Sequence, residues 1–314
     1  MLISTRVLLL GAILVTPLFA ATARIERKVE KTFHISGVGK VRLETMGGKL
    51  QVTPGEGSVV TVTAVQKIKA DSDSEADDLL KKLELTFEQS GNDVIAIAKY
   101  ESRPSGFRFG SWPPVNVDFI VTVPASFGAE LRTSGGAIEV GDLNGDVNAR
   151  TSGGPIRLGK MGAEVTAHTS GGPITMSEAR GPVDLETSGG NIKVGRVAGS
   201  AELSTSGGNI QIDSVENSLR AHTSGGSIRA GIHGPLKDDC ILNTSGGSVT
   251  ATIDKSAAFR LDASTSGGGV DAKGLTLTLD SNGSKRGRLS GLVNGGGPLL
   301  KLRSSGGNIL VRSE

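Results

Sequence analysis

The tetrapeptide Thr-Ser-Gly-Gly recurs at a nearly constant interval, and this recurrence constrains the fold more than any other feature of the chain. The steps are 18 residues long up to Thr223 and then 21 residues long twice. The eight copies begin at Thr133, Thr151, Thr169, Thr187, Thr205, Thr223, Thr244 and Thr265. Two variants, Thr45-Met46-Gly47-Gly48 and Ser304-Ser305-Gly306-Gly307, lie near the ends. Such a fixed period is typical of solenoids, in which each repeat packs only on its neighbours.

Apolar residues occupy fixed positions around every copy, four and two residues before the Thr and five and seven residues after it. Around Thr187 these are Val183, Leu185, Ile192 and Val194, and the residues between them are mostly polar. This alternation has the period of a strand with one buried face. We therefore predict an all-β fold, a parallel β-solenoid of about eight to ten coils of 18–21 residues with two strands each.

The prediction specifies how the coils fit together. The aliphatic side chains of successive coils, for example Ile156, Ile174 and Ile192, should form a ladder. We expect Ser-Gly-Gly to form the turn between the two strands, with glycine supplying a positive φ. The Thr hydroxyls should bond neighbouring coils, and the two 21-residue intervals should add a bulge or a longer turn. We interpret the two variants as real coils or capping strands.

The chain divides into four predicted parts. Residues 1–23 have the pattern of a secretory signal peptide, with Arg6, an apolar run and an Ala21-Thr22-Ala23 cleavage site; a cut after Ala20 is the alternative. Residues 24–127 should form a head and cap with a degenerate first coil, 128–273 the solenoid, and 274–314 irregular C-terminal coils and a cap. We expect an exported protein, periplasmic or on the cell surface, without a transmembrane segment once the signal is removed.

The head contains a break in the repeat. Ser72–Leu83 has the pattern of a short helix, and strand-like runs follow at Leu83–Glu88, Val94–Lys99 and Val115–Val123. We expect this segment to fold over the N-terminal end of the stack, because an open end presents unpaired backbone groups to other chains. Gly274 to Leu299 also lacks the repeat, and we expect it to cap the far end.

These features together resemble a known bacterial family. The signal peptide, the strand–helix–strand head, the Val123-Pro124 lead-in and the T-S-G-G-x-I-x-V coils resemble a family of candidate adhesins, a domain of unknown function with a β-solenoid core. The resemblance spans Thr32 to Val311. It implies an envelope-associated or secreted solenoid with an adhesive or structural role, and it supplies no catalytic residues.

Several chemistries are disfavoured by the residues themselves. The Ser of Thr-Ser-Gly-Gly occurs eight times without a nucleophile-elbow motif, and we interpret it as a turn residue. Neither a phosphate-binding loop nor the Asp-containing turn of a calcium β-roll is present, so we expect no cofactor and no metal. His168 and His222 share one outward position three coils apart, too far apart to bind one metal ion. The net charge of +2 disfavours nucleic acid as a partner, and Cys240 should be a small core residue.

Two groups of residues remain as binding-surface candidates. Asp184, Glu186 and Glu202 face outward on adjacent coils, with Lys193 and Arg220 expected nearby. The carboxylates of Asp184 and Glu202 could approach to roughly 5 Å, the separation found in retaining glycosidases. A solvated charged face is the competing interpretation. The second group is Phe107, Phe109 and Trp112, in the Pro-rich loop 103–114, which would form a binding lip or pack back onto the head.

Three functional hypotheses follow. The first is a non-enzymatic adhesin or envelope interaction protein whose polar face binds a glycan or an envelope protein. The alternative is a polysaccharide-active enzyme that uses the outward carboxylates near Asp184 and Glu202. A periplasmic sensor or scaffold is the third.

Overall fold

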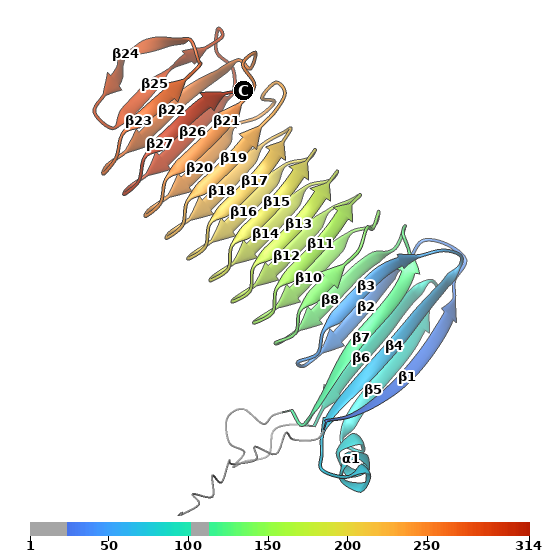
Figure 1. The fold of residues 1–314 in the computed structure, drawn as a ribbon. Helices are drawn as coiled ribbons and strands as arrows, with labels where there is room; N and C mark the ends of the chain where they lie inside the picture. The colour runs from blue at the N-terminus through green and yellow to red at the C-terminus, as the bar shows by residue number, and fades with distance from the viewer. Residues whose placement is uncertain (1–23, 102–112) are drawn as a thin grey trace, which may run out of the picture.

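The protein is a long two-sheet rod (Figure 1). The computed structural model describes residues 24–101 and 113–314. One sheet has 13 strands and the other has 14. The fold is the predicted all-β parallel solenoid. The predicted signal peptide, residues 1–23, lies outside the described residues.

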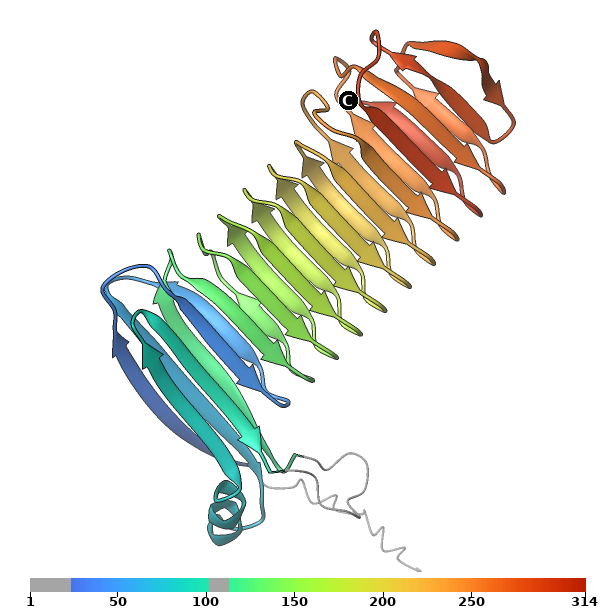
Figure 2. The ribbon, with the colours of Figure 1, turned by 180° about the vertical axis from the view of Figure 1, so that it is seen from behind.

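Each coil gives one strand to each sheet, and strands of successive coils lie side by side along the rod (Figures 1 and 2). The first strands of the coils, in the 14-stranded sheet, are β2 (Lys40–Thr45), β8 (Gly128–Thr133), β10 (Val147–Thr151), β12 (Val165–Thr169), β14 (Val183–Thr187), β16 (Ala201–Thr205), β18 (Leu219–Thr223), β20 (Cys240–Thr244), β22 (Phe259–Thr265) and β26 (Leu299–Ser304). The second strands, in the 13-stranded sheet, are β3 (Leu50–Gly55), β9 (Ile138–Val140), β11 (Ile156–Met161), β13 (Ile174–Ala179), β15 (Ile192–Val197), β17 (Ile210–Val215), β19 (Ile228–Ile232), β21 (Val249–Ile253), β23 (Val270–Lys273) and β27 (Ile309–Ser313). Both variant tetrapeptides therefore belong to real coils.

The aliphatic ladder is confirmed. Ile156 pairs in register with Ile174, and Ile174 pairs with Ile192. All three side chains are buried in one core that runs the length of the rod. Full burial of such a side chain contributes roughly 1.5–3 kcal/mol, so a few aliphatics per coil stabilise a core that has few aromatic residues.

The threonine hydroxyls join each coil to the next through the backbone. From Thr133 onward, and at Ser304, each hydroxyl donates to the carbonyl of the second glycine in the adjacent coil, the one nearer the N-terminal end of the rod. The distances are 2.7–3.0 Å. The same oxygen accepts the N–H of the second glycine of its own coil. From Thr133 onward, one hydroxyl thus satisfies two backbone groups at each of these corners.

The glycine pair is needed for a reason different from the predicted one. No glycine of the Thr-Ser-Gly-Gly turns has a φ between +20° and +160°. Instead, a Cβ added to the second glycine would overlap the carbonyl of the second glycine in the adjacent coil. At Gly190, for example, it would overlap the carbonyl of Gly172. A Cβ on the first glycine, Gly189, would only reach ordinary contact at 3.4 Å. Close stacking of backbones, and not a left-handed conformation, requires the second glycine.

The order of the coils in space differs from their order in the sequence at the C-terminal end. β26 pairs with both β20 and β22, and β27 pairs with both β21 and β23. The last coil of the chain is therefore inserted between the two coils that precede it. The predicted longer turns lie at residues 233–239 and 254–258, and the second turn carries the chain past the inserted coil.

The N-terminal end contains a further coil that has no Thr-Ser-Gly-Gly. β6 (Asp93–Tyr100) pairs in parallel with β2, and β7 (Val115–Pro124) pairs in parallel with β3. This coil lies outside the coil of β2 and β3, although it follows that coil in the sequence.

The rest of the head extends the sheets and does not fold over the open end as expected. β4 (Val59–Lys69) pairs antiparallel with β7, β1 (Arg24–His34) with β4, and β5 (Leu83–Ser90) with β6. The predicted strands are confirmed. The helix, α1 (Asp73–Leu80), ends before Leu83, which starts β5. Ser72 is its N-cap, and the Ser72 hydroxyl accepts the N–H of Glu75.

The segment from Gly274 to Leu299 was expected to be irregular, but most of it is a hairpin. β24 (Leu277–Lys285) and β25 (Arg288–Val293) pair antiparallel, and β25 continues the 14-stranded sheet beyond β22. The hairpin lies at the C-terminal end of the rod (Figure 1). The hairpin covers the edge of β22 and leaves the edge of β24 unpaired instead. It does not form another coil, because the segment lacks the Thr-Ser-Gly-Gly turn.

Candidate binding site

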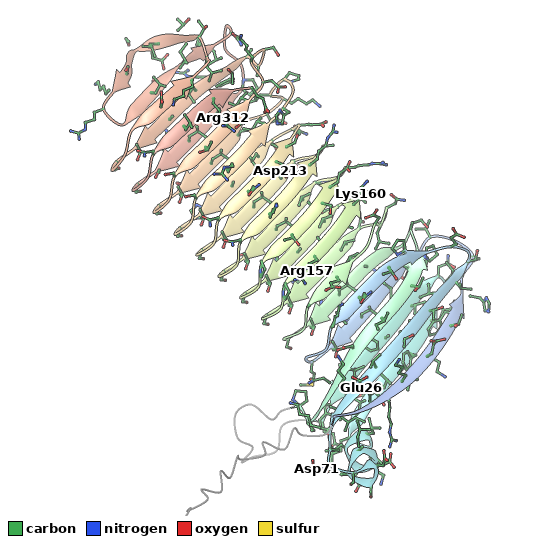
Figure 3. The ribbon with its side chains drawn as sticks, in the orientation of Figure 1. Glu26, Asp71, Arg157, Lys160, Asp213 and Arg312 are labelled. Atoms are coloured by element: carbon green, nitrogen blue, oxygen red, sulfur yellow. The ribbon has the colours of Figure 1, made fainter. Side chains whose placement is uncertain are left out.

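Outward side chains form straight columns along the rod because the coils stack in register. Figure 3 shows them on both sheets, with Arg157, Asp213 and Arg312 labelled on strands of the 13-stranded sheet. The inward positions and the corners repeat from coil to coil, whereas the outward residues differ. Chemical variety is therefore confined to the outer surface.

The predicted carboxylates lie in these columns on the 14-stranded sheet. Asp184 pairs in register with Glu202, and Glu186 pairs with Ser204. The side chains of Asp184 and Glu186 are 53% and 61% exposed. Asp184 and Glu202 line a shallow hollow of about 240 Å³ together with Arg220. The hollow is open and holds side chains of both charge signs.

The neighbours of these carboxylates differ in part from expectation. Arg220 pairs in register with Glu202, as predicted. Lys193, however, lies on β15 in the opposite sheet. Its place beside Asp184 is taken by His168, whose Nε2 lies 3.6 Å from an oxygen of Asp184, beyond hydrogen-bond length.

A larger hollow of about 780 Å³ lies on the same sheet, nearer the N-terminal end of the rod, where several strands begin. It extends from Val38, before β2, to Thr166 on β12, and Glu164 lines both hollows. Its floor holds Glu130, Asn148 and Thr166, which pair in register on adjacent strands. These three residues occupy the same position, three before the Thr, as Asp184 and Glu202 in later coils. The repeat register places these residues in one outward column, but the sequence carries no signal for the hollow above them.

The floor has unused hydrogen-bonding capacity. The Oδ1 atom of Asn148 is enclosed by protein and has no hydrogen-bond partner within residues 24–101 and 113–314. Glu130 forms an ion pair with Arg132 at 2.9 Å. Leaving a buried acceptor unpaired costs about 1–3 kcal/mol, so a turn of the Asn148 side chain that brings this oxygen to a donor would be favoured.

The wall of this hollow is held by side chain–backbone bonds. The Asn92 amide accepts the N–H of Ser36 at 3.0 Å and donates to the carbonyl of Val38 at 3.3 Å. Asp93 accepts the N–H of Lys40 at 2.9 Å. These contacts fix the turn before β2, so the hollow is formed in advance of any ligand.

The remaining predicted groups are placed as follows. Phe107, Phe109 and Trp112 lie outside the described residues. Cys240 is fully buried, as predicted, and burial raises the pKa of its thiol to about 11. His233 lies 2.9 Å from Asp254, and the N–H of Gly234 and His233 lower the pKa of that carboxyl.

Two features are absent from the described part of the chain. Within residues 24–101 and 113–314, no three His, Cys, Asp or Glu side chains gather as metal ligands do. In the same residues no helix has the length and apolar character needed to cross a bilayer.

The fold and its corners define a parallel β-solenoid. The chain belongs to the family described as Toastrack DUF4097, whose family model matches residues 38–312. No curated protein matches the sequence.

Solved structures similar to this chain include three proteins described as candidates for adhesion. One from Clostridium sporogenes is 12% identical, with 92% of this chain and 100% of that chain covered and a TM-score of 0.27. One from Bacteroides fragilis is 12% identical, with coverage of 92% and 97% and a TM-score of 0.41. One from Parabacteroides distasonis is 10% identical, with coverage of 92% and 97% and a TM-score of 0.36.

Proposed function

We propose that the protein is an exported, non-enzymatic adhesin or envelope interaction protein that binds through the outer face of its 14-stranded sheet. Its place would be the periplasm or the cell surface. The observation that supports this most is the register of the coils, which turns differing outward residues into continuous columns on a rigid frame. Extended surfaces of this kind are what solenoid proteins use for binding.

Attachment of purified protein to isolated cell envelopes and to a glycan array tests the proposal. Residues 24–314 should attach in a saturable manner. A triple variant that spans both hollows of the 14-stranded face, Glu130→Lys, Thr166→Lys and Glu202→Lys, should attach at least tenfold less. The matched control carries Arg157→Glu and Lys193→Glu on the opposite sheet and should attach like the wild type. The proposal would be excluded if the protein attached saturably neither to the cell envelopes nor to the glycan array.

The same preparation separates a binding rod from a polysaccharide-cleaving enzyme. Incubation with polysaccharides should release no reducing ends, from the wild type or from the Glu202→Gln variant. Release of reducing ends that Glu202→Gln abolishes would replace adhesion with catalysis.

A further inference from the structure

We propose that the hollow between Val38 and Thr166 binds an uncharged, extended saccharide chain. This inference rests on the proposed function and deepens it by naming the site and the class of ligand. The hollow is the place where unused polar groups, a fixed wall and about 780 Å³ of space coincide.

The floor groups match the chemistry of sugar hydroxyls. Asn148 lines the hollow, and its amide N–H₂ is a donor for a hydroxyl oxygen. Its unpaired Oδ1 is enclosed by protein, so this oxygen becomes an acceptor for the ligand only when the side chain turns. The Thr166 hydroxyl, without a hydrogen bond in the described residues, can donate or accept. Carboxylates such as Glu164 and Asp146 at the rim accept strong hydrogen bonds from hydroxyl groups. Asp146 is itself held in place by the N–H of Glu164 at 3.2 Å.

The spacing favours a sugar chain over a peptide. The hollow begins beside Asp93 and Lys40, the first residues of β6 and β2, and it crosses β8, β10 and β12. These last three strands place Glu130, Asn148 and Thr166 at steps of about 4.8 Å. A pyranose ring in an extended chain advances by nearly the same step. An extended peptide presents side chains on one face every 6.6 Å or so and loses this register. It also cannot add as a strand here, since these strands are already paired on both sides.

Charge selects among saccharides. The hollow is lined by Asp93, Glu130, Asp146 and Glu164, and among the described residues Lys40 is the one cationic side chain in its lining. Uronate or phosphate groups would meet like charges and be rejected. Val38, 72% exposed at the rim, offers an apolar contact for the face of one ring.

Titration calorimetry with residues 24–314 tests the site. The probes are cellohexaose and N-acetylchitohexaose, with hexagalacturonate and octalysine as competitors of other chemistry. We expect the two neutral hexasaccharides to bind saturably and hexagalacturonate and octalysine not to bind. Asn148→Leu and Thr166→Val should each weaken binding at least tenfold. Asn243→Leu and Thr175→Val, outward residues elsewhere on the rod, are the matched controls and should bind like the wild type.

Several results would overturn the inference. The first is that neither neutral hexasaccharide binds. The second is that the Asn148→Leu and Thr166→Val variants bind the hexasaccharides as tightly as the wild type does. The third is that hexagalacturonate or octalysine binds more tightly than the neutral hexasaccharides. If envelopes still bind the protein in any of these cases, the site is wrong and the proposed function stands. Hexasaccharide binding that requires Asn148, without attachment to envelopes, would support the site and reject the adhesive role.

Discussion

At the scale of single residues, each position of the corner has its own task. The Thr hydroxyl links two coils, and the second glycine lets their backbones approach. The Ser and the first glycine are exposed at every corner. Half of the repeated tetrapeptide therefore holds the stack together, and the other half faces solvent.

The two glycines of one corner should respond differently to the same substitution. Gly190→Ala places a Cβ against the carbonyl of Gly172 and forces the coils apart. We expect it to cost about 1–3 kcal/mol, as overpacking does. Gly189→Ala, its matched control, should change the free energy of unfolding by about 0.5 kcal/mol or less. Denaturant unfolding of both variants measures this, and equal losses would contradict the stacking argument.

The hydroxyl bond can be tested at the same corner. Thr187→Val keeps the side-chain shape but leaves the Gly172 carbonyl and the Gly190 N–H without their partner. The expected loss is about 1–3 kcal/mol in the free energy of unfolding. Ser188→Ala, one residue away and exposed, should be neutral to about 0.5 kcal/mol. A Thr187→Val protein as stable as the wild type would show that the bond contributes nothing.

The sequence permitted most residue-level predictions inside the repeat and fewer outside it. Alternation placed Ile156 and Cys240 in the core because each inward position recurs in every coil. It could not give the reason for the second glycine, since a positive φ and a close backbone approach both demand glycine. Nor could it indicate the floor of Glu130, Asn148 and Thr166, which becomes a hollow only through the turn at Val38.

At the scale of elements, the repeat predicted the strands but not their neighbours. The coils that carry Thr-Ser-Gly-Gly or a variant of it share one corner, so the repeat alone does not fix which of them the coil of β26 and β27 stacks on. Its insertion between β20 and β22 depends on the length of the 254–258 turn and on the β24–β25 hairpin. The β6–β7 coil was missed as a coil because it lacks the tetrapeptide and has a long connection between its strands.

Cys240 reports on the inserted coil. Cys240 pairs with Leu300 of β26, it is fully buried, and its pKa of about 11 keeps it protonated near pH 8. Reaction with a thiol reagent at that pH therefore requires the coils to open. Gly307→Ala, which forces a Cβ against Gly247, should speed labelling of Cys240 severalfold under native conditions.

The control for this experiment is the same substitution far from the thiol. Gly154→Ala strains the stack against Gly136 in a coil near the other end. It should leave native-state labelling of Cys240 close to the wild-type rate. Equal acceleration by both variants would mean that the thiol is exposed only when the whole rod unfolds.

At the scale of the whole molecule, the rod is a chain of nearest-neighbour contacts, and its described residues leave four strand edges unpaired. These edges are β1 and β5 at one end and β23 and β24 at the other. β1 carries many charged residues of both signs, including Glu26, Arg27 and Lys28, which oppose pairing with a second chain. The shape follows from the absence of any turn that bends the stack back on itself.

Nearest-neighbour stacking predicts how a local defect spreads. Gly190→Ala strains the contact between the coils of β12–β13 and β14–β15 near the middle of the rod. Because each coil contacts only those beside it, hydrogen exchange should accelerate in β12, β14 and β16. Exchange in β2 and β26, several coils away, should stay at the wild-type rate. Exchange mass spectrometry on peptides from each coil measures the profile. Uniform acceleration along the rod would instead show that all the coils unfold as one cooperative unit, and distant parts of the surface would then be coupled in stability.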